Sequence, residues 1–391
     1  MSGSESLERR QLRELTRRFV TRDVLPHLDG WERSGEVPRG LHSTAAELGL
    51  LGLGFPDAVG GSGGDLRDSL LVTEELILAG GSSGLVAALF THGIALPHMV
   101  TAWQQHHQSG SGQRAATELV DRYVRPTLAG ARIGALAVTE PDGGSDVAAL
   151  RTTARRDGAD YLVNGTKTFV TSGVRADFVT TAVRTGPPGA AGISLLVIDK
   201  DAPGCTVDRR LDKLGWHCSD TATLSFVDVR VPAGNLVGTE NGGFAAIMRQ
   251  FDTERLSLAT QAYATAQRCL DLTLAWCRDR HTFGAPLVAR QVVRHRLAEM
   301  ATRTAAARAY VRQVADRVAA GEAVPHEVAM AKNAAVSACD RVVDQAVQLH
   351  GGHGYLRDSE VERHYRDARI LGIGGGTTEI MNEIIARGLG I

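Results

Sequence analysis

The sequence has no excess of charge of either sign. Its 43 Lys and Arg residues face 44 Asp and Glu residues, which gives a formal net charge of −1. This balance argues against a nucleic-acid or anionic-membrane partner held by bulk charge. Cysteine is scarce as well, with five residues, an odd number, and no Cys-x-x-Cys pair. We therefore expect neither a disulfide framework nor a zinc site. The expected environment is a reducing compartment.

Long apolar runs are also missing. The longest candidate, Gly84–Pro97, is interrupted by His92 and falls short of the ~18 apolar residues that a membrane span needs. The amino terminus is rich in Arg but also carries acidic residues such as Glu8 and Glu14. It lacks the apolar core of a secretory signal and the acid-poor composition of a transit peptide. The expectation is a cytoplasmic protein with no membrane span.

What the chain does have is the composition of a globular protein. It has 391 residues, of which 43% are hydrophobic and 22% charged, enough for about two or three domains. Helical spacing of apolar residues dominates both ends, and short β-prone runs lie between them. We predict an α+β fold with an amino-terminal helical domain (1–130), a central antiparallel β domain (131–240) and a carboxy-terminal helical bundle domain (241–391).

Several residues predict where elements begin and end. Asp65 can cap one helix, Pro325 suits the first turn of another, and a last helix can start at Thr377. Asn164-Gly165 between two β-prone runs predicts a hairpin turn. The polar segment His106–Gln113 predicts a loop.

Two segments with β-prone neighbours could contact a cofactor. Residues 139–146, T-E-P-D-G-G-S-D, are small enough for backbone amides to approach a phosphate or a ring, and the alternative is a tight connection. Thr171 and Ser172 end a β-prone run, where a hydroxyl could donate to a cofactor while Phe169 stacks on a flat ring. The alternative is an ordinary hairpin with Phe169 in the core.

Glu254 is the candidate general base. It interrupts an otherwise apolar helical stripe, and burial raises the pKa of a carboxyl group, which suits proton abstraction. Positions 257 and 258 are Ser and Leu, so the helix offers no cation one turn later. The alternative is that Glu254 faces solvent.

Glycine pairs and triplets mark three further sites. Gly374 to Gly376 precede a helix start, a geometry that suits an anion or a close backbone contact, although simple capping by Thr377 is the alternative. Gly351-Gly352 explains a helix stop. A metal site at the flanking histidines, His350 and His353, is disfavoured because no carboxylate or cysteine stands at ligand spacing.

Six motifs in this order resemble the flavin-dependent acyl-CoA dehydrogenase family over nearly the whole chain. They are T-E-P-D-G-G-S-D (139–146), G-T-K-T-F-V-T-S-G (165–173), F-D-T-E-R-L (251–256), D-R-H-T-F-G (279–284), Q-L-H-G-G-H-G-Y (348–355) and G-G-G-T-T-E-I-M (374–381). The resemblance implies an amino-terminal helical domain, a β domain and a carboxy-terminal four-helix bundle.

The resemblance also implies bound FAD. The residues that match the positions around the isoalloxazine ring are Leu136, Val138, Thr139, Gly144, Ser145, Phe169, Val170 and Thr171, with Thr171 donating to the hydride-accepting nitrogen. Those matching the positions that hold the adenosine-diphosphate part of a neighbouring subunit's FAD are Arg280, Phe283, Gln291, Gln348, Leu349, Gly351 and Gly352. Those expected near the pyrophosphate are Thr377, Thr378 and Glu379. Such a shared site implies a homo-oligomer, most often a homotetramer.

The position of the base departs from many family members. These carry a catalytic Glu where this chain has Gly375, whereas a subset resembling the long-chain and isovaleryl enzymes carries it in the F-D-x-E-R-L segment, as Glu254 here. The implied reaction is α,β-dehydrogenation of an acyl-CoA or acyl-carrier thioester to the trans-2-enoyl thioester. Glu254 would take the α-proton and FAD the β-hydride, and an electron-transfer flavoprotein would reoxidise the FAD. The residues expected along the substrate's path are Ser145, Asp252, Arg255, Gly375 and Gly376.

The substrate and the rival functions remain open at this point. Gly374 stands where some relatives carry Tyr, which suggests a pocket for branched or bulky acyl chains. An acyl-CoA oxidase or a flavin monooxygenase on the same fold is one alternative. A non-catalytic acyl-thioester binding protein is the other.

Overall fold

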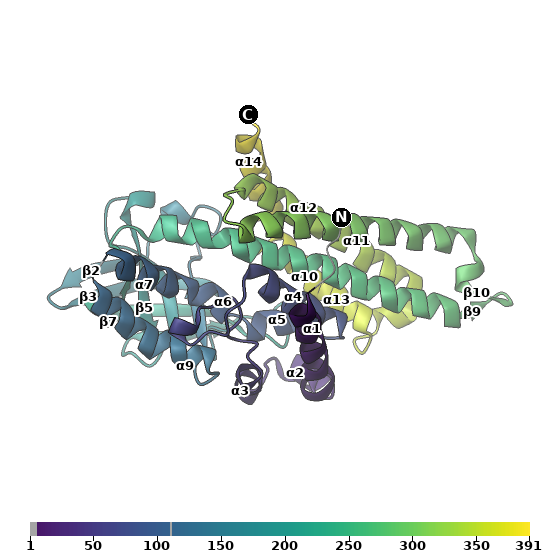
Figure 1. The fold of residues 1–391 in the computed structure, drawn as a ribbon, viewed down its shortest axis with the longest axis horizontal. Helices are drawn as coiled ribbons and strands as arrows, with labels where there is room; N and C mark the ends of the chain where they lie inside the picture. Colours follow the sequence, from purple (N-terminus) through teal and green to yellow (C-terminus); the bar gives the residue numbers. More distant parts are fainter. Residues whose placement is uncertain (1–5, 110–111) are drawn as a thin grey trace.

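The computed structural model describes residues 6–109 and 112–391 and combines helices with one large sheet (Figure 1). The sheet lies on the left in Figure 1 and the long helices lie on the right. The helices before the sheet are α1 (Leu7–Phe19), α2 (Leu28–Ser34), α3 (Gly40–Glu47), α4 (Leu66–Leu78), α5 (Ser83–Leu89), α6 (His92–Ala95), α7 (Pro97–Ser109), α8 (Gln113–Leu119) and α9 (Arg125–Leu128).

The sheet has eight strands and is mostly antiparallel. Its strands are β1 (Gly134–Ala137), β2 (Thr153–Asp157), β3 (Asp160–Thr171), β4 (Phe178–Arg184), β5 (Ile193–Asp199), β6 (Cys205–Arg210), β7 (Thr221–Pro232) and β8 (Leu236–Val237). The strand order is β6-β7-β3-β2-β4-β5-β8, and β1 pairs with β4 in parallel. A parallel pair also joins β2 to β4 at Thr153 and Arg184.

Long helices follow the sheet. They are α10 (Gly243–Asp279), α11 (Gln291–Ala319), α12 (Pro325–His350), α13 (Glu360–Ala368) and α14 (Thr378–Gly388), with the short hairpin β9 (His281–Thr282) and β10 (Ala285–Pro286) between α10 and α11. Helix α10 extends from the sheet to this hairpin at the far end of the molecule (Figure 1). The predicted α+β fold, with helices before and after a sheet, is confirmed.

Apolar packing joins these regions. One core cluster runs from the first helices, with Phe19 and Leu76, into the bundle, with Ala262 and Val342. A second cluster packs α7 against β4 and β5, whose inward residues alternate along each strand as the pleat requires. Among the helices of the described residues, none is by itself long and apolar enough to cross a membrane, although Ser83–Leu89 and His92–Ser109 meet that requirement as a bent pair.

The helix ends lie where local chemistry placed them. Asp65 accepts from the Arg67 N–H at the start of α4, Pro325 opens α12, and the Thr377 side chain accepts from the Ile380 N–H at the start of α14. Gly351 ends α12 with φ +60°, a conformation that glycine adopts without strain.

Two expectations about turns were wrong. Asn164-Gly165 is not a hairpin turn but lies inside β3 at a register shift, a β-bulge whose Gly165 has φ +147°. A Cβ atom there would lie 2.5 Å from Thr152 Oγ1, so packing rather than a turn requires this glycine. Both ends of the expected loop His106–Gln113 are helical, since α7 continues to Ser109 and α8 begins at Gln113. Residues 110–111 lie outside the described residues.

Candidate active site

A cavity of about 1430 Å³ lies where the sheet meets the two helical regions. Its wall is built from residues of five segments, which fall within 50–73, 86–104, 136–171, 213–261 and 366–387. Pockets for one small ligand measure roughly 300–1,000 Å³. The cavity therefore has room for two ligands side by side, such as a flavin and a thioester.

The sheet side of the cavity carries most of the residues expected around a flavin ring. Those that line it are Leu136, Val138, Thr139, Gly144, Ser145, Phe169 and Thr171. Val170 does not, because side chains alternate along β3 and its own lies in the core of the sheet. Phe169 is 68% exposed and has φ +56°, so the alternative of a core Phe169 is wrong. An exposed aromatic ring in a cavity that is also lined by a glycine and three hydroxyl side chains, Thr139, Ser145 and Thr171, fits a flat, hydrogen-bonding ring system such as a flavin.

The segment 139–146 is anchored by a buried ion pair. Lys167 Nζ lies 2.8 Å from Glu140 Oε1 and donates to the Val138 carbonyl at 2.9 Å. Glu140 also accepts from the backbone N–H groups of Arg151 and Thr152, at 2.6 and 2.8 Å. Burial alone would raise the pKa of Glu140, but Lys167 and these N–H groups hold it below its ordinary value. The conformation of the segment 139–146 therefore depends on the carboxylate of Glu140.

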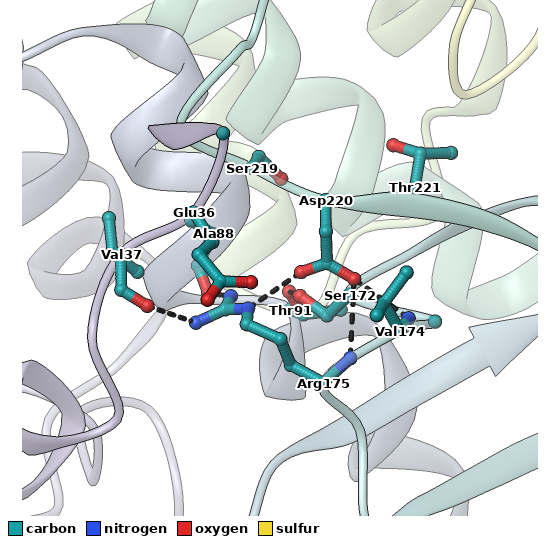
Figure 2. A network of polar contacts seen from close by, with 12 residues as sticks. Glu36, Val37, Ala88, Thr91, Ser172, Val174, Arg175, Ser219, Asp220 and Thr221 are labelled. Carbon is teal, nitrogen blue, oxygen red and sulfur yellow. Dashed lines mark hydrogen bonds and ion pairs between the residues drawn. The ribbon is translucent and has the colours of Figure 1, made fainter. Parts of the chain in front are cut away.

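The end of β3 is held by a polar network (Figure 2). Ser172, with φ +59°, bonds to Thr91 through the two hydroxyl groups at 2.7 Å. Asp220 accepts from the Val174 N–H at 2.7 Å and from Arg175 Nε at 2.6 Å. The same guanidinium donates to the Val37 and Ala88 carbonyls of the first helical region, at 2.8 and 3.3 Å. The network thus joins the end of β3, which carries Thr171, to the first helical region.

Glu254 also lines the cavity, and it comes from α10. Burial raises the pKa of its carboxyl group above the ordinary value, and the nearby cations Lys332 and Arg255 oppose that rise. Gly375 lies directly beside it, since a Cβ atom on residue 375 would be 3.6 Å from Glu254 Oε1 and 2.7 Å from Leu258 Cδ1. With φ +64° as well, this position suits glycine and leaves the space in front of the carboxylate open.

The neighbours of Glu254 in the F-D-T-E-R-L segment divide between two roles. Arg255 lines the cavity, donates from Nε to the Gly375 carbonyl at 3.1 Å, and pairs with Asp252 through Nη1 at 3.1 Å. Asp252 is not among the residues that line the cavity. Its carboxylate therefore orients Arg255 rather than facing a ligand.

Lys332 was not singled out by the motifs. It is 1% exposed and donates from Nζ to the carbonyls of Gly374 and Gly376, at 2.5 Å each. Its sequence signal was a lone cation in the apolar stripe of α12, between Val328 and Ala335. That signal becomes specific only once the packing of the glycine segment on α12 is known.

The segment that follows the glycines contributes less to the cavity than expected. Gly375, Gly376 and Thr377 line it, whereas Thr378 and Glu379 do not. These two residues form the first turn of α14, with Glu379 exposed.

The residues expected at the adenosine-diphosphate part lie elsewhere, at the far end of α10. None of Arg280, Phe283, Gln291, Gln348, Leu349, Gly351 and Gly352 lines the cavity. Trp276 packs against the segment that contains part of this set. Its Nε1 donates to the Leu349 carbonyl, and its ring stacks on the rings of His350 and His353, each with a centroid distance of 5.0 Å. Phe283 is 97% exposed. From Glu254 to Arg280 the helix rises about 39 Å, so one chain does not bring the two groups together.

Comparison with known proteins identifies the family. Family models for acyl-CoA dehydrogenases match residues 6–109 (N-terminal domain), 135–229 (middle domain) and 241–390 (C-terminal domain). A probable acyl-CoA dehydrogenase of Bacillus subtilis (strain 168) is 35% identical over 98% of this chain and 98% of its own length. The long-chain specific acyl-CoA dehydrogenase, mitochondrial, of Sus scrofa is 36% identical over 96% of this chain and 85% of its own.

A solved structure agrees with these matches. The crystal structure of a probable acyl-CoA dehydrogenase from Mycobacterium abscessus is 63% identical and has a TM-score of 0.94, covering 98% of this chain and 99% of that one. This chain therefore belongs to the acyl-CoA dehydrogenase family, the flavin-dependent oxidoreductases that act on the CH–CH group of acyl-CoA thioesters.

Proposed function

We propose that this chain oxidises an acyl-CoA to the trans-2-enoyl thioester with Glu254 as the base that removes the α-proton. The observation that carries the assignment is the place of Glu254 beside Gly375 in the wall of the same cavity that Phe169 and Thr171 line. The pairing of Glu254 with Gly375 also supports the subset that resembles the long-chain and isovaleryl enzymes.

The residues that line the cavity have different roles in the proposed reaction. The Gly375 N–H donates to the thioester carbonyl, which stabilises negative charge on that oxygen as the α-proton leaves for Glu254. Thr171 and Phe169 orient the cofactor, and Ser145 and Arg255 line the path to the cavity. FAD, when bound, supplies the acceptor for the hydride from the β-carbon.

The same proposal includes a second copy of the chain. Arg280, Phe283 and Gln291 are exposed. Arg280 caps α10 about 39 Å along the helix from the base, and the other two follow it in the hairpin and at the start of α11. Exposed aromatic and Arg side chains at one end of a molecule are typical of surfaces that another molecule covers. We infer that this end holds the adenosine-diphosphate part of a neighbouring subunit's FAD in a homotetramer.

A Phe283→Asp variant tests this arrangement. We expect it to retain FAD about 30-fold more weakly, which corresponds to about 2 kcal/mol, and to elute as a smaller assembly. Asp tolerates the positive φ of this position, so the backbone is not newly strained. Light scattering and the flavin content after dialysis are the measurements.

The control for that variant is Val227→Asp. Val227 is 62% exposed on β7 and belongs to neither group of proposed cofactor residues. It should leave the mass and the flavin content unchanged. A Phe283→Asp protein with normal mass and normal FAD would contradict the shared site.

The substrate class we propose is a branched or bulky acyl chain. A Cβ atom on Gly374 would meet only the Ile370 carbonyl oxygen, at 3.6 Å, so the cavity is open at this position. Electrons would pass to an electron-transfer flavoprotein. A chain from a solved structure named for the electron transferring flavoprotein of Acidaminococcus fermentans is 30% identical to this one, with a TM-score of 0.91.

Anaerobic mixing of the purified protein with a panel of acyl-CoA thioesters tests the function. We expect the yellow flavin to bleach, fastest with branched chains. Equal or faster bleaching by straight chains would overturn the substrate class. Rapid peroxide formation in air would indicate an oxidase instead, and a protein that refuses FAD would indicate a binding protein.

A further inference from the structure

Lys332 holds the glycine segment 374–376 and does not itself line the cavity. It comes from the apolar face of α12, and its ammonium is enclosed by protein. A buried ammonium is costly unless its hydrogen bonds are satisfied. Both hydrogen bonds that satisfy it come from this one segment, from the Gly374 and Gly376 carbonyls. The conformation of the segment and the burial of the cation therefore depend on each other.

Two cations together hold three consecutive carbonyls of this segment. Arg255 Nε donates to the carbonyl of Gly375, between the two that Lys332 holds. Arg255 is itself fixed by Asp252. Each peptide plane from Gly374 to Gly376 thus has its oxygen bound by a positive charge, in a segment whose glycines would otherwise permit many orientations.

Holding these oxygens also aims the N–H groups. The chain has no cis peptide bond among its described residues, and in a trans peptide the C=O and N–H point in opposite directions. Since the Gly374 oxygen points to Lys332, the Gly375 N–H of the same peptide points away from it. Within residues 6–109 and 112–391 nothing accepts a hydrogen bond from that N–H, and Gly375 lines the cavity. A donor is left available for a ligand.

We propose that Lys332 is a positioning residue for catalysis, which holds the Gly374–Gly375 peptide so that the Gly375 N–H donates to the thioester carbonyl. This rests on the proposed function, because the acceptor is the substrate's carbonyl oxygen. The charge of Lys332 also polarises the peptide, and a polarised amide is a stronger donor. A donor of this kind, aimed at a developing oxyanion, accounts for about 10²–10³ in rate.

The same ammonium acts on the base. Lys332 on α12 and Arg255 on α10 are the cations that oppose the rise in the pKa of Glu254 caused by burial. Loss of the Lys332 charge therefore raises that pKa further. The carboxylate form would then be populated only at higher pH, which gives the role a second, separate signature.

The test follows α-proton exchange in D₂O, with the FAD-loaded enzyme and 3,3-dimethylbutanoyl-CoA. This thioester has α-protons but no β-hydrogen, so exchange reports proton abstraction without hydride transfer. Burial lowers the pKa of Lys332 to about 8, so the rates are compared below that pH, where the wild-type ammonium is charged. There we expect the exchange rate of Lys332→Met to fall about 10- to 100-fold. The acid limb of its pH profile should shift to higher pH, while thioester binding changes less than the rate.

A matched control is Lys200→Met. Lys200 Nζ also holds two carbonyls, of Gly173 and Val174 at 2.6 and 3.4 Å, and the residue does not line the cavity. Lys200 is half-buried. We expect Lys200→Met to lower the melting temperature, because two hydrogen bonds are lost, but to leave the exchange rate within about twofold of the wild type. If Lys332→Met fails to hold FAD, Lys332→Gln, whose uncharged amide still has two N–H donors, should show an intermediate rate.

The outcomes separate this role from the proposed function. Wild-type enzyme that binds the thioester, as a perturbed flavin spectrum shows, but exchanges no α-protons would contradict the function itself. A second outcome would overturn only the role of Lys332. In it the wild type exchanges α-protons, while Lys332→Met or Lys332→Gln exchanges them at the wild-type rate within twofold and has its acid limb at the same pH.

Discussion

Glu254→Gln is expected to slow flavin reduction by an acyl-CoA by about 10²–10⁴-fold. Gln has the size of Glu but cannot accept the α-proton, and a positioned general base contributes roughly 10²–10⁴ in rate. The flavin content and the dissociation constant of the thioester should stay near those of the wild type. Stopped-flow loss of flavin colour under anaerobic conditions measures the rate, and titration of the flavin spectrum measures binding.

The pH profile gives this prediction a second readout. Burial raises the pKa of Glu254, and only the ionised carboxylate takes a proton. The wild-type rate should therefore rise with pH through a pKa above the ordinary carboxyl value, and the residual rate of Glu254→Gln should lack that rise.

Asp252→Asn is the matched control for the base. Asp252 lies on the same helix as Glu254, and this variant removes its carboxylate. That carboxylate pairs with Arg255 and does not line the cavity. The variant should retain the pH-dependent rise and lose much less rate. Near-normal reduction by Glu254→Gln would show that the α-proton goes to another group.

Local chemistry explains which parts of the fold the sequence could predict. Asp65, Pro325 and Thr377 act within one turn of their own helix, so each marked a boundary that the structure has. Asn164-Gly165 failed because the same dipeptide that favours a hairpin turn also suits a bulge. What decides between them is the contact of Gly165 with Thr152, which only the folded sheet creates.

The same distinction holds for the site, where some residues could be named from motifs and others only from the folded structure. The resemblance named Glu254, Phe169 and Thr171, and all three line one cavity. It did not name Lys332, because a cation in an apolar helical stripe gains meaning only from the carbonyls that fold onto it. The residues expected at the adenosine-diphosphate part do not reach that cavity within one chain, because the long helix α10 separates them from it.

Glu140→Leu is expected to destabilise the protein by about 3–5 kcal/mol. It would leave the Lys167 ammonium, which is 0% exposed, without its carboxylate. The urea midpoint of unfolding and the rate of FAD release measure the effect. Because the pKa of Glu140 is lowered in the folded state, this contribution is present at neutral pH and is lost as the pH falls through the lowered pKa.

The double variant Glu140→Leu with Lys167→Met separates the cost of a broken pair from the value of the intact one. Well-packed apolar residues can replace a buried pair at little cost, so we expect the double variant to be much more stable than Glu140→Leu. It should still release FAD faster than the wild type, because Leu cannot accept from the Arg151 and Thr152 N–H groups that tie down the segment 139–146. Glu140→Leu within about 1 kcal/mol of the wild type would mean that water or a rearranged loop satisfies Lys167, and the cavity wall would then not depend on this pair.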